Sequence, residues 1–431
     1  MNSKIIFLPL LFLYVVIVMV ASSSDSYVNL ANQQSQGFVA SGEERVMTDY
    51  FVYDEIRYIK FAVNLTKGFY SPRDNIDLWA GPGYPIILVP FVMLKLPWLA
   101  AKLLNPLFLY AAILLFYYTL RLYITNRSSM IISYIIGLNP PFMRYLPNLM
   151  TEVFVIFLVC GFTYHFCKFY HVGEDAKSQL LISSLYLAYL ALTKVFFGYV
   201  ILTGLLLFLI LYIIKKRMNL KNSLLVYLLA IVFCLPYLFY TYSLTGKVFY
   251  WANSGGSSLY WMSTPYPDEL GDWRSTIEVF GNPSLENHRQ FYRELSELPS
   301  LQKDDALKKR AMNNIINNPQ KYLKNWIANI GRMLFHYPYT YRPPRVKIYY
   351  FANMIPGMFL VVLSVLCIYP SYRGRRLIPY EIYALVIFAL IAFAGSSLVS
   401  AYSRQFQPLV PVFALWIIFT LFNVLKIEVR Q

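Results

Sequence analysis

Long apolar segments recur along the whole chain, and the short stretches between them carry most of its charge. Charged residues make up 14% of the 431 residues, whereas soluble domains contain roughly 25%. A helix of about 20 apolar residues crosses a bilayer and satisfies its own backbone hydrogen bonds while it does so. The sequence therefore predicts an all-α, polytopic integral membrane protein.

The lengths and spacing of these segments predict about ten transmembrane helices. Their ranges are 5–21, 106–123, 128–143, 151–168, 180–193, 196–214, 222–242, 350–369, 379–399 and 405–425. The first of them ends like a signal peptide, in small residues, but we interpret it as a helix that is retained.

One further apolar segment, 84–104, differs from the others because prolines and lysines interrupt it. Proline removes a backbone donor and breaks helices, and lysine is costly in lipid. This segment is therefore predicted to be juxtamembrane or re-entrant and to return to the side from which it came.

Basic residues are distributed unevenly between the two sides of this topology. Counting sides alternately, one side receives Lys4, Arg121, Arg127, Lys168, Lys177, Lys215, Lys216, Arg217, Lys221, Arg373, Arg375, Arg376, Lys426 and Arg430. The short loops of the other side hold Arg144, Lys194 and Arg404. Because cytoplasmic loops are enriched in Lys and Arg, the first side is predicted to be cytoplasmic. The two long loops, 22–83 and 243–349, are then external.

This topology divides the chain into an N-terminal membrane region, a second external loop and a C-terminal membrane region, which are residues 1–242, 243–349 and 350–431. The second external loop begins with a stretch rich in Gly, Ser, Tyr and Trp, which suits a binding loop. Its later part is predicted to be helical over 285–298 and 303–335. Pro319 is expected to begin a new helix, because proline is tolerated at a first helical position.

Acidic residues, tyrosines and a Gly/Pro turn crowd together at 49–90, in the first external loop and the segment after it. Acids beside a bilayer are candidates for chemistry, although they can also belong to an ordinary solvated loop. We predict Asp54 as a catalytic base and Glu55 as its competitor for that role. Asp77 is predicted as a second catalytic carboxylate, which orients the acceptor or shares the base role. On a helix, Tyr58 would share the face of Asp54, whereas Glu55 would be turned about 100° away.

Charged residues also lie at the predicted external ends of later spans. Lys194 separates two apolar runs, Arg404 opens the last span, and Arg342 and Arg345 flank a proline pair. We predict that these cations bind a lipid-linked phosphate, although Lys194 and Arg404 could instead reach the headgroups. Glu152 opens the span at 151–168 and could be either a substrate contact or a helix-capping residue. Cations that hold a phosphate and a carboxylate that takes a proton suit group transfer from a lipid phosphate.

Several short motifs, each weak alone, occur in an order that spans most of the chain. They are Tyr53-Asp54-Glu55 with Tyr58, Ala62-Val63-Asn64-Leu65 with Gly68, Asp77 with Pro82-Gly83-Tyr84-Pro85, Thr151-Glu152, Thr193-Lys194, Arg404 with Pro408 and Pro411, and Asn318-Pro319-Gln320-Lys321-Tyr322-Leu323. With these motifs the chain resembles the GT-C superfamily of membrane glycosyltransferases. It is closest in style to the group of protein O-mannosyltransferases and lipid A aminoarabinose transferases.

The resemblance implies a polyprenyl-phosphate sugar as donor, a lipid, glycan or protein as acceptor, and inversion at the anomeric carbon. We expect substrate contacts from Tyr58, Tyr84 and Glu152. No cofactor is expected, and the first loop lacks an Asp-x-Asp pair, which argues against an obligatory divalent metal. The expected location is the bacterial inner (cytoplasmic) membrane, with the active site facing outward.

Two other functions fit a multi-spanning chain of this kind. A polysaccharide polymerase or ligase also has one large external loop, but the acids of the first loop would then lack a purpose. A non-enzymatic lipid or sugar transporter tends to have internal repeats and paired broken helices at the midplane, and no repeat is evident here. Nucleic acid is not a predicted partner, because the net charge of +16 comes from short clusters between apolar segments.

Overall fold

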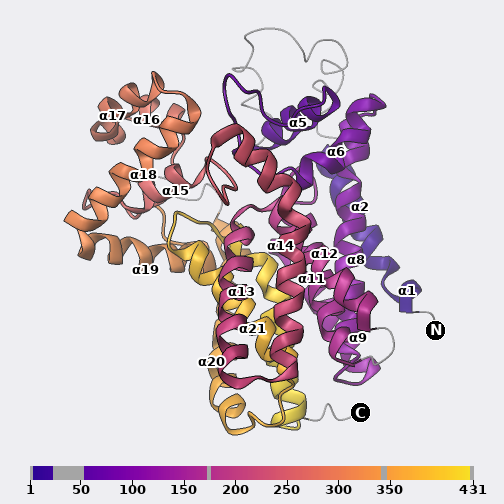
Figure 1. The fold of residues 1–431 in the computed structure, drawn as a ribbon. Helices are drawn as coiled ribbons and strands as arrows, with labels where there is room; N and C mark the ends of the chain where they lie inside the picture. The colour runs from indigo at the N-terminus through magenta and orange to yellow at the C-terminus, as the bar shows by residue number, and fades with distance from the viewer. Residues whose placement is uncertain (1–2, 23–52, 172–175, 341–346, 428–431) are drawn as a thin grey trace.

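The computed structural model describes residues 3–22, 53–171, 176–340 and 347–427. All regular secondary structure in these residues is helical. Figure 1 shows a bundle of long helices with a smaller unit of shorter helices, α15–α19, beside its upper end. The predicted all-α, polytopic architecture is therefore confirmed.

Seven helices in the described residues are long and apolar enough to cross a membrane. They are Trp98–Leu120 (α7 and α8), Thr151–His171 (α11), Phe196–Lys215 (α13), Met218–Thr245 (α14), Met354–Arg373 (in α20, Lys347–Arg373), Tyr380–Ser397 (α21) and Ser403–Val424 (α22 to η3). The three other predicted spans coincide with α2 (Leu8–Ser22), α9 (Asn126–Gly137) and α12 (Ala176–Thr193). These three are shorter or less apolar, so the count of ten stays a prediction.

The segment 84–104 is divided by a sharp turn. α6 (Gly83–Met93) has 11 residues, or about 16 Å of helix, whereas the bilayer core is about 30 Å thick. After it, Lys95 adopts a positive φ of 51° before the next helix begins at Trp98. The candidate span thus begins at Trp98 rather than at 106, and the end of the predicted juxtamembrane segment belongs to that span.

The N-terminal helix α2 packs into the bundle through one buried side. The hydroxyl of Tyr14 donates a hydrogen bond to the carbonyl of Gly137 at 2.7 Å. A Cβ at Gly137 would lie 2.7 Å from Leu10 and 3.0 Å from the Tyr14 hydroxyl. A larger residue at position 137 would have to displace the ends of the Leu10 and Tyr14 side chains, so glycine suits the close approach of α2 to α9.

The described part of residues 243–349, predicted as the second external loop, contains a small helical unit, which we call the outer unit. It contains α15 (Gly255–Met262), α16 (Thr276–Gly281), α17 (Glu286–Ser296), α18 (Ser300–Asn317) and α19 (Pro319–Phe335). Its apolar core consists of Tyr260, Trp261, Val279, Leu285, Tyr292, Leu295, Leu307 and Ala311. The helices predicted at 285–298 and 303–335 are present. The second stretch contains two helices, α18 and α19, and Pro319 is the first residue of α19, as expected.

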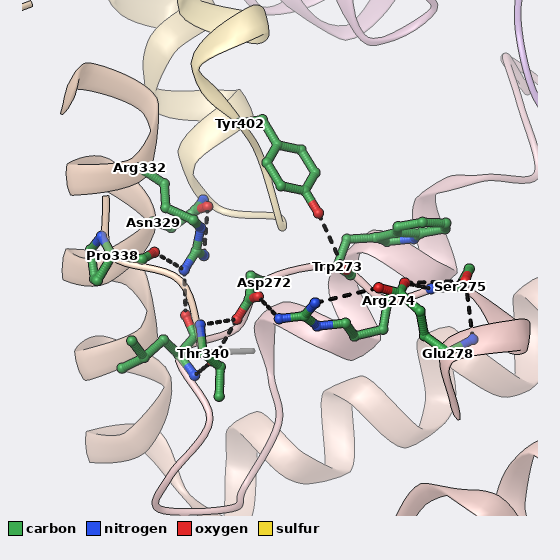
Figure 2. A network of polar contacts seen from close by, with 11 residues as sticks. Asp272, Trp273, Arg274, Ser275, Glu278, Asn329, Arg332, Pro338, Thr340 and Tyr402 are labelled. Atoms are coloured by element: carbon green, nitrogen blue, oxygen red, sulfur yellow. Dashed lines mark hydrogen bonds and ion pairs between the residues drawn. The ribbon is translucent and has the colours of Figure 1, made fainter. Parts of the chain in front are cut away.

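A buried polar network connects this unit to the loop between α21 and α22 (Figure 2). Arg332 of α19 donates hydrogen bonds to the carbonyl oxygens of Leu270, at 2.9 Å, and Pro338, at 3.3 Å. The hydroxyl of Tyr402, in the loop, donates to the carbonyl of Trp273 at 3.0 Å. The chain that immediately precedes Arg404 is thereby held against the outer unit.

Candidate active site

The helix α5 (Tyr53–Thr66) directs its two adjacent acids to different places. Both acids lie in its first turn, where negative charge is favourable for the helix dipole. Asp54 faces a cavity together with Tyr58, one turn later. Glu55 is fully buried and accepts a hydrogen bond from the backbone N–H of Leu149 at 2.6 Å. The arrangement follows the 100° step between neighbouring residues on a helix.

Four charged side chains from distant parts of the chain form one connected cluster. Nη1 of Arg404 lies 2.8 Å from Oδ2 of Asp54 and 3.7 Å from Oε1 of Glu152. Nζ of Lys194 donates to the same Glu152 oxygen at 2.9 Å. Only 3% of the Glu152 side chain is exposed, and a carboxylate buried to that degree needs a paired cation. The two acids and two bases together carry no net charge.

Glycines allow the chain between α5 and α6 to approach the turn that carries Lys194. A Cβ at Gly81 would lie 2.0 Å from the carbonyl oxygen of Leu192, and one at Gly83 would lie 2.5 Å from Oγ1 of Thr193. No side chain fits at either position without moving the backbone. The Gly/Pro turn found in the sequence therefore brings α5 and Lys194 to the same site.

The cluster borders a cavity of about 1060 Å³, which is at the upper end of the range for ligand sites. Its lining includes Arg144, Lys194 and Arg404, the basic residues that the sequence assigns to the short external loops. Three segments that are distant in sequence thus contribute a cation to one cavity. Lys308, Asp54 and Glu278 also line the cavity, so its cations outnumber its acids by four to two. This modest excess of positive charge suits an anionic ligand.

The carboxyl of Asp54 experiences opposing influences. Burial favours its neutral form and raises its pKa, but the ion pair with Arg404, assisted by Arg57 and Lys194, lowers it. The net result is a pKa below the ordinary value of 3.8. Asp54 is therefore an ionised carboxylate at neutral pH and can accept a proton.

His336 is a neutral polar group on the cavity wall. Burial, with a smaller effect of Arg144, lowers its pKa to about 4. Its Nδ1 lies 3.1 Å from Oγ of Ser403 and 3.0 Å from the hydroxyl of Tyr339. His336 therefore supports the residue next to Arg404 without adding charge.

The other predicted site residues lie in different surroundings. Asp77 is not among the residues that line the cavity; it accepts from the backbone N–H of Trp79 at 3.3 Å and pairs with Lys60 at 3.6 Å. Its hydrogen bond to Trp79, which does line the cavity, orders that part of the cavity wall. The predicted role of Asp77 in the reaction stays a prediction. Tyr84 is buried behind Tyr58, with ring centroids 5.3 Å apart. Arg342 and Arg345 fall outside the described residues.

Several cavity residues were missed in the sequence interpretation. Arg144 was detectable, because it belongs to the same small set of external basic residues as Lys194 and Arg404. Trp273 and His336 come from irregular parts of the second external loop, where no periodicity marks them. In the described residues, no group of three or more His, Cys, Asp and Glu side chains could hold a metal ion.

No protein-family model and no curated protein sequence matches this chain. Its structure is similar to the crystal structure of the Archaeoglobus fulgidus oligosaccharyltransferase in the apo form, with a TM-score of 0.51. The identity is 12%, and the match covers 96% of this chain and 50% of that chain. The chain has the GT-C fold. The resemblance drawn from the sequence motifs is thus confirmed at the level of the fold.

Two further structures match this chain with lower scores. One is the archaeal oligosaccharyltransferase AglB from Archaeoglobus fulgidus in complex with an inhibitory peptide and a dolichol-phosphate, with a TM-score of 0.48, 14% identity, and coverage of 88% of this chain and 48% of that one. The other is ArnT from Cupriavidus metallidurans bound to undecaprenyl phosphate, with a TM-score of 0.39, 12% identity, and coverage of 86% and 73%. The chain spans about half the length of the archaeal proteins that it matches.

Proposed function

We propose that this protein is a glycosyltransferase that moves a sugar from a polyprenyl-phosphate donor to an acceptor at the external face of the membrane. The transferred unit is a hexose or a pentose, and the acceptor is a lipid, a glycan or a protein. The proposed location is the bacterial inner membrane. The name of the archaeal protein whose fold the chain shares, an oligosaccharyltransferase, supports sugar transfer as the general class of reaction.

The observation that carries the proposal is the position of Asp54 beside Arg404 and Lys194 in one cavity. A sugar phosphate needs cations for the leaving phosphate and a carboxylate for the acceptor hydroxyl. The cluster supplies these groups, and Arg144 adds a further positive charge on the same cavity wall.

In the proposed reaction, Asp54 accepts the proton of the acceptor hydroxyl as its oxygen forms a bond to the anomeric carbon. The bond between that carbon and the phosphate oxygen breaks on the opposite face, which inverts the configuration. The polyprenyl phosphate leaves with the bonding electrons, and Arg404 and Lys194 stabilise its charge. Phosphate is a good leaving group, so the step needs no strong general acid.

Arg404 has a second effect in this scheme, because Asp54 and the donor phosphate compete for its guanidinium. While Arg404 is paired with Asp54, it lowers the pKa of the carboxyl and weakens it as a base. When the guanidinium turns toward the phosphate, burial raises that pKa again. Donor binding would therefore activate the base.

The function is tested by deleting the gene and analysing envelope glycans and lipids by mass spectrometry. A species that lacks one sugar unit is expected, and the wild-type gene should restore the complete species. Asp54→Asn should not restore it. Asp74→Asn is the matched control, because Asp74 is an exposed acid of the same loop and does not line the cavity. Full restoration by Asp54→Asn, or unchanged glycans in the deletion strain, contradicts the proposal.

A further inference from the structure

The helix α19 has its polar side chains on the inside. Asn325, Asn329 and Arg332 recur at helical spacing along one face and are completely buried. Nδ2 of Asn325 donates hydrogen bonds to the carbonyl oxygens of Met262, at 3.0 Å, and Thr264, at 3.1 Å. This face of α19 therefore packs against the rest of the outer unit and donates hydrogen bonds to its main-chain carbonyls.

The opposite face of α19 is apolar and exposed. Leu323 and Ile327 are 50% and 62% exposed, and the partly exposed Ile330 continues the stripe at the same helical spacing. This stripe is displaced by two residues from the buried polar one, which corresponds to about 200° around a helix. A helix on the surface of a soluble protein has the reverse arrangement. The outward face of α19 thus needs apolar surroundings.

One part of α19 lies across the end of a candidate membrane span. Nε1 of Trp326 donates to Oγ of Ser397 at 2.9 Å, and the hydroxyl of Tyr322 donates to the carbonyl of Leu398 at 2.7 Å. Ser397 is the last residue of α21. Tryptophan and tyrosine are enriched where membrane meets water, so both contacts place α19 at that level.

The C-terminal end of α19 reaches a second candidate span at the same level. A Cβ at Gly357 would lie 1.9 Å from the carbonyl oxygen of Leu334, so α19 and α20 touch there. Gly357 belongs to the first turn of the candidate span Met354–Arg373. In Figure 1, α19 runs across the direction of the bundle helices, as the lower edge of the outer unit.

We propose that α19 is an interfacial helix whose Leu323–Ile327 face is embedded in the outer boundary of the lipid bilayer. Its apolar stripe is continuous with a lipid-facing surface, because Ile355 and Phe359 of α20, on either side of Gly357, are exposed as well. Lys324 is exposed beside the stripe and is placed to reach lipid phosphate groups. The occupant of this face is lipid, rather than another protein.

The lipid contact of α19 supports the position of Arg404. The side chain of Asn329 donates to the carbonyls of Ser397, at 2.8 Å, and Val399, at 2.7 Å. Its Oδ1 accepts from the backbone N–H of Ala401 at 3.0 Å. The loop before Arg404 thus rests on a helix that the membrane surface holds in place. This inference concerns the membrane contact and does not depend on the proposed reaction.

The test uses the full chain reconstituted in nanodiscs of phosphatidylcholine and phosphatidylglycerol. A nitroxide is attached at Leu323→Cys or Ile327→Cys, and its collisions with oxygen and with a water-soluble nickel chelate are measured. The native cysteines in the described residues are buried, and the unsubstituted protein measures their residual labelling. Phe280→Cys is the matched control, because Phe280 is an apolar residue of α16 that is 41% exposed. In Figure 1, α16 and α19 lie at opposite edges of the outer unit.

A several-fold higher ratio of oxygen to nickel collisions is expected at both α19 positions than at position 280. Equal ratios at all three positions would place the stripe in water and overturn the proposal. Dipolar broadening that disappears on dilution with unlabelled protein would assign the face to a second copy and would also overturn it. A thermal midpoint equal to that of the unlabelled chain establishes that each labelled protein is folded.

Discussion

Asp54 and Arg404, which are 350 residues apart in the chain, form an ion pair of 2.8 Å on the wall of the cavity. The pair joins the helix of the first external loop to the start of the last candidate span. Neither residue is fully exposed or fully buried, so the pair lies between a weak surface bridge and a costly buried one. In the proposed reaction, this intermediate setting would let Arg404 exchange partners when the donor phosphate binds.

Asp54→Asn should abolish most of the turnover, whereas Glu55→Gln should not. General-base catalysis is typically worth about 10²–10⁴-fold, and asparagine keeps the shape of the side chain while it removes the basicity. Glu55 accepts a hydrogen bond from Leu149, and a glutamine oxygen can do the same, so the expected effect is on stability. Initial rates are compared at equal amounts of folded protein.

Donor affinity serves as the control for the Asp54 experiment. Asp54→Asn should still bind the polyprenyl-phosphate sugar, because it removes no cation from the site. An active Asp54→Asn beside an inactive Glu55→Gln would transfer the catalytic role to Glu55. Two active variants would remove α5 from the chemistry and favour a transporter.

Arg404→Gln should move the acidic limb of the pH–rate profile to higher pH. In the wild type, the pKa of Asp54 is lowered below its ordinary value because Arg404 outweighs burial. Without the guanidinium, burial dominates and the pKa rises, so a larger fraction of the carboxyl is protonated at mildly acidic pH. The measurement is kcat/KM from about pH 4 to about pH 8. If the acidic limb does not move, the ionisation of Asp54 does not control the rate, and Asp54 is not the catalytic base.

The same linkage determines how stability depends on pH. The folded-state pKa of Asp54 is depressed, so its contribution is fully present above the unfolded-state pKa. That contribution is lost as the pH falls through the folded-state pKa. Urea unfolding of the wild type should therefore show an acid-dependent loss of stability that is smaller in Arg404→Gln, since that variant has already lost the pair.

The sequence was informative where charge interrupts an apolar background. Asp54, Lys194 and Arg404 stand out in the sequence because a charged side chain beside lipid is energetically costly and therefore indicates a functional site. The boundary at Pro319 was predictable because its missing N–H is harmless only at the start of a helix. In both cases a local physical rule determines the outcome.

The sequence was uninformative where tertiary contacts decide. Asp77 lies in an irregular loop, whose path depends on hydrogen bonds between its own backbone and side chains. No helical or strand periodicity in the sequence could therefore predict where its carboxylate points. The span that begins at Trp98 was predicted to begin only at 106, because the prolines and lysines of 84–104 were interpreted as interruptions of a helix. Pro97 comes just before the first residue of the helix Trp98–Lys102, and Lys102 is buried in the bundle, so neither residue prevents a span from starting at Trp98.

Lys194→Met should destabilise the protein and weaken donor binding through separate causes. It leaves the buried Glu152 with Arg404 at 3.7 Å, and removing one partner of a buried pair costs about 3–5 kcal/mol. The double variant Lys194→Met, Glu152→Gln removes both charges and should recover most of that loss. Thermal unfolding measures this effect.

Donor affinity should stay low in both Lys194 variants, because the cation is absent from each. A charge-assisted contact is worth about 1.5–3 kcal/mol, or roughly 10–150-fold in Kd. Titration with undecaprenyl phosphate in nanodiscs provides the measurement. If the double variant binds the lipid phosphate like the wild type, Lys194 is a structural partner of Glu152 and does not bind the donor.

Cysteines at Arg121 and Arg127 should be protected from an impermeant thiol reagent added to intact cells, whereas a cysteine at Arg144 should react. Arg144 lines the cavity together with Lys194 and Arg404. These cavity residues therefore lie at one end of the molecule, and the charge distribution assigns that end to the outside. α6 has 11 residues and ends at a turn, so it is too short to carry Arg121 across to that side. Lysed cells should label all three positions, which controls for reactivity. Labelling at Arg121 in intact cells would mean that the segment 84–104 crosses the bilayer and that the charge rule fails for this chain.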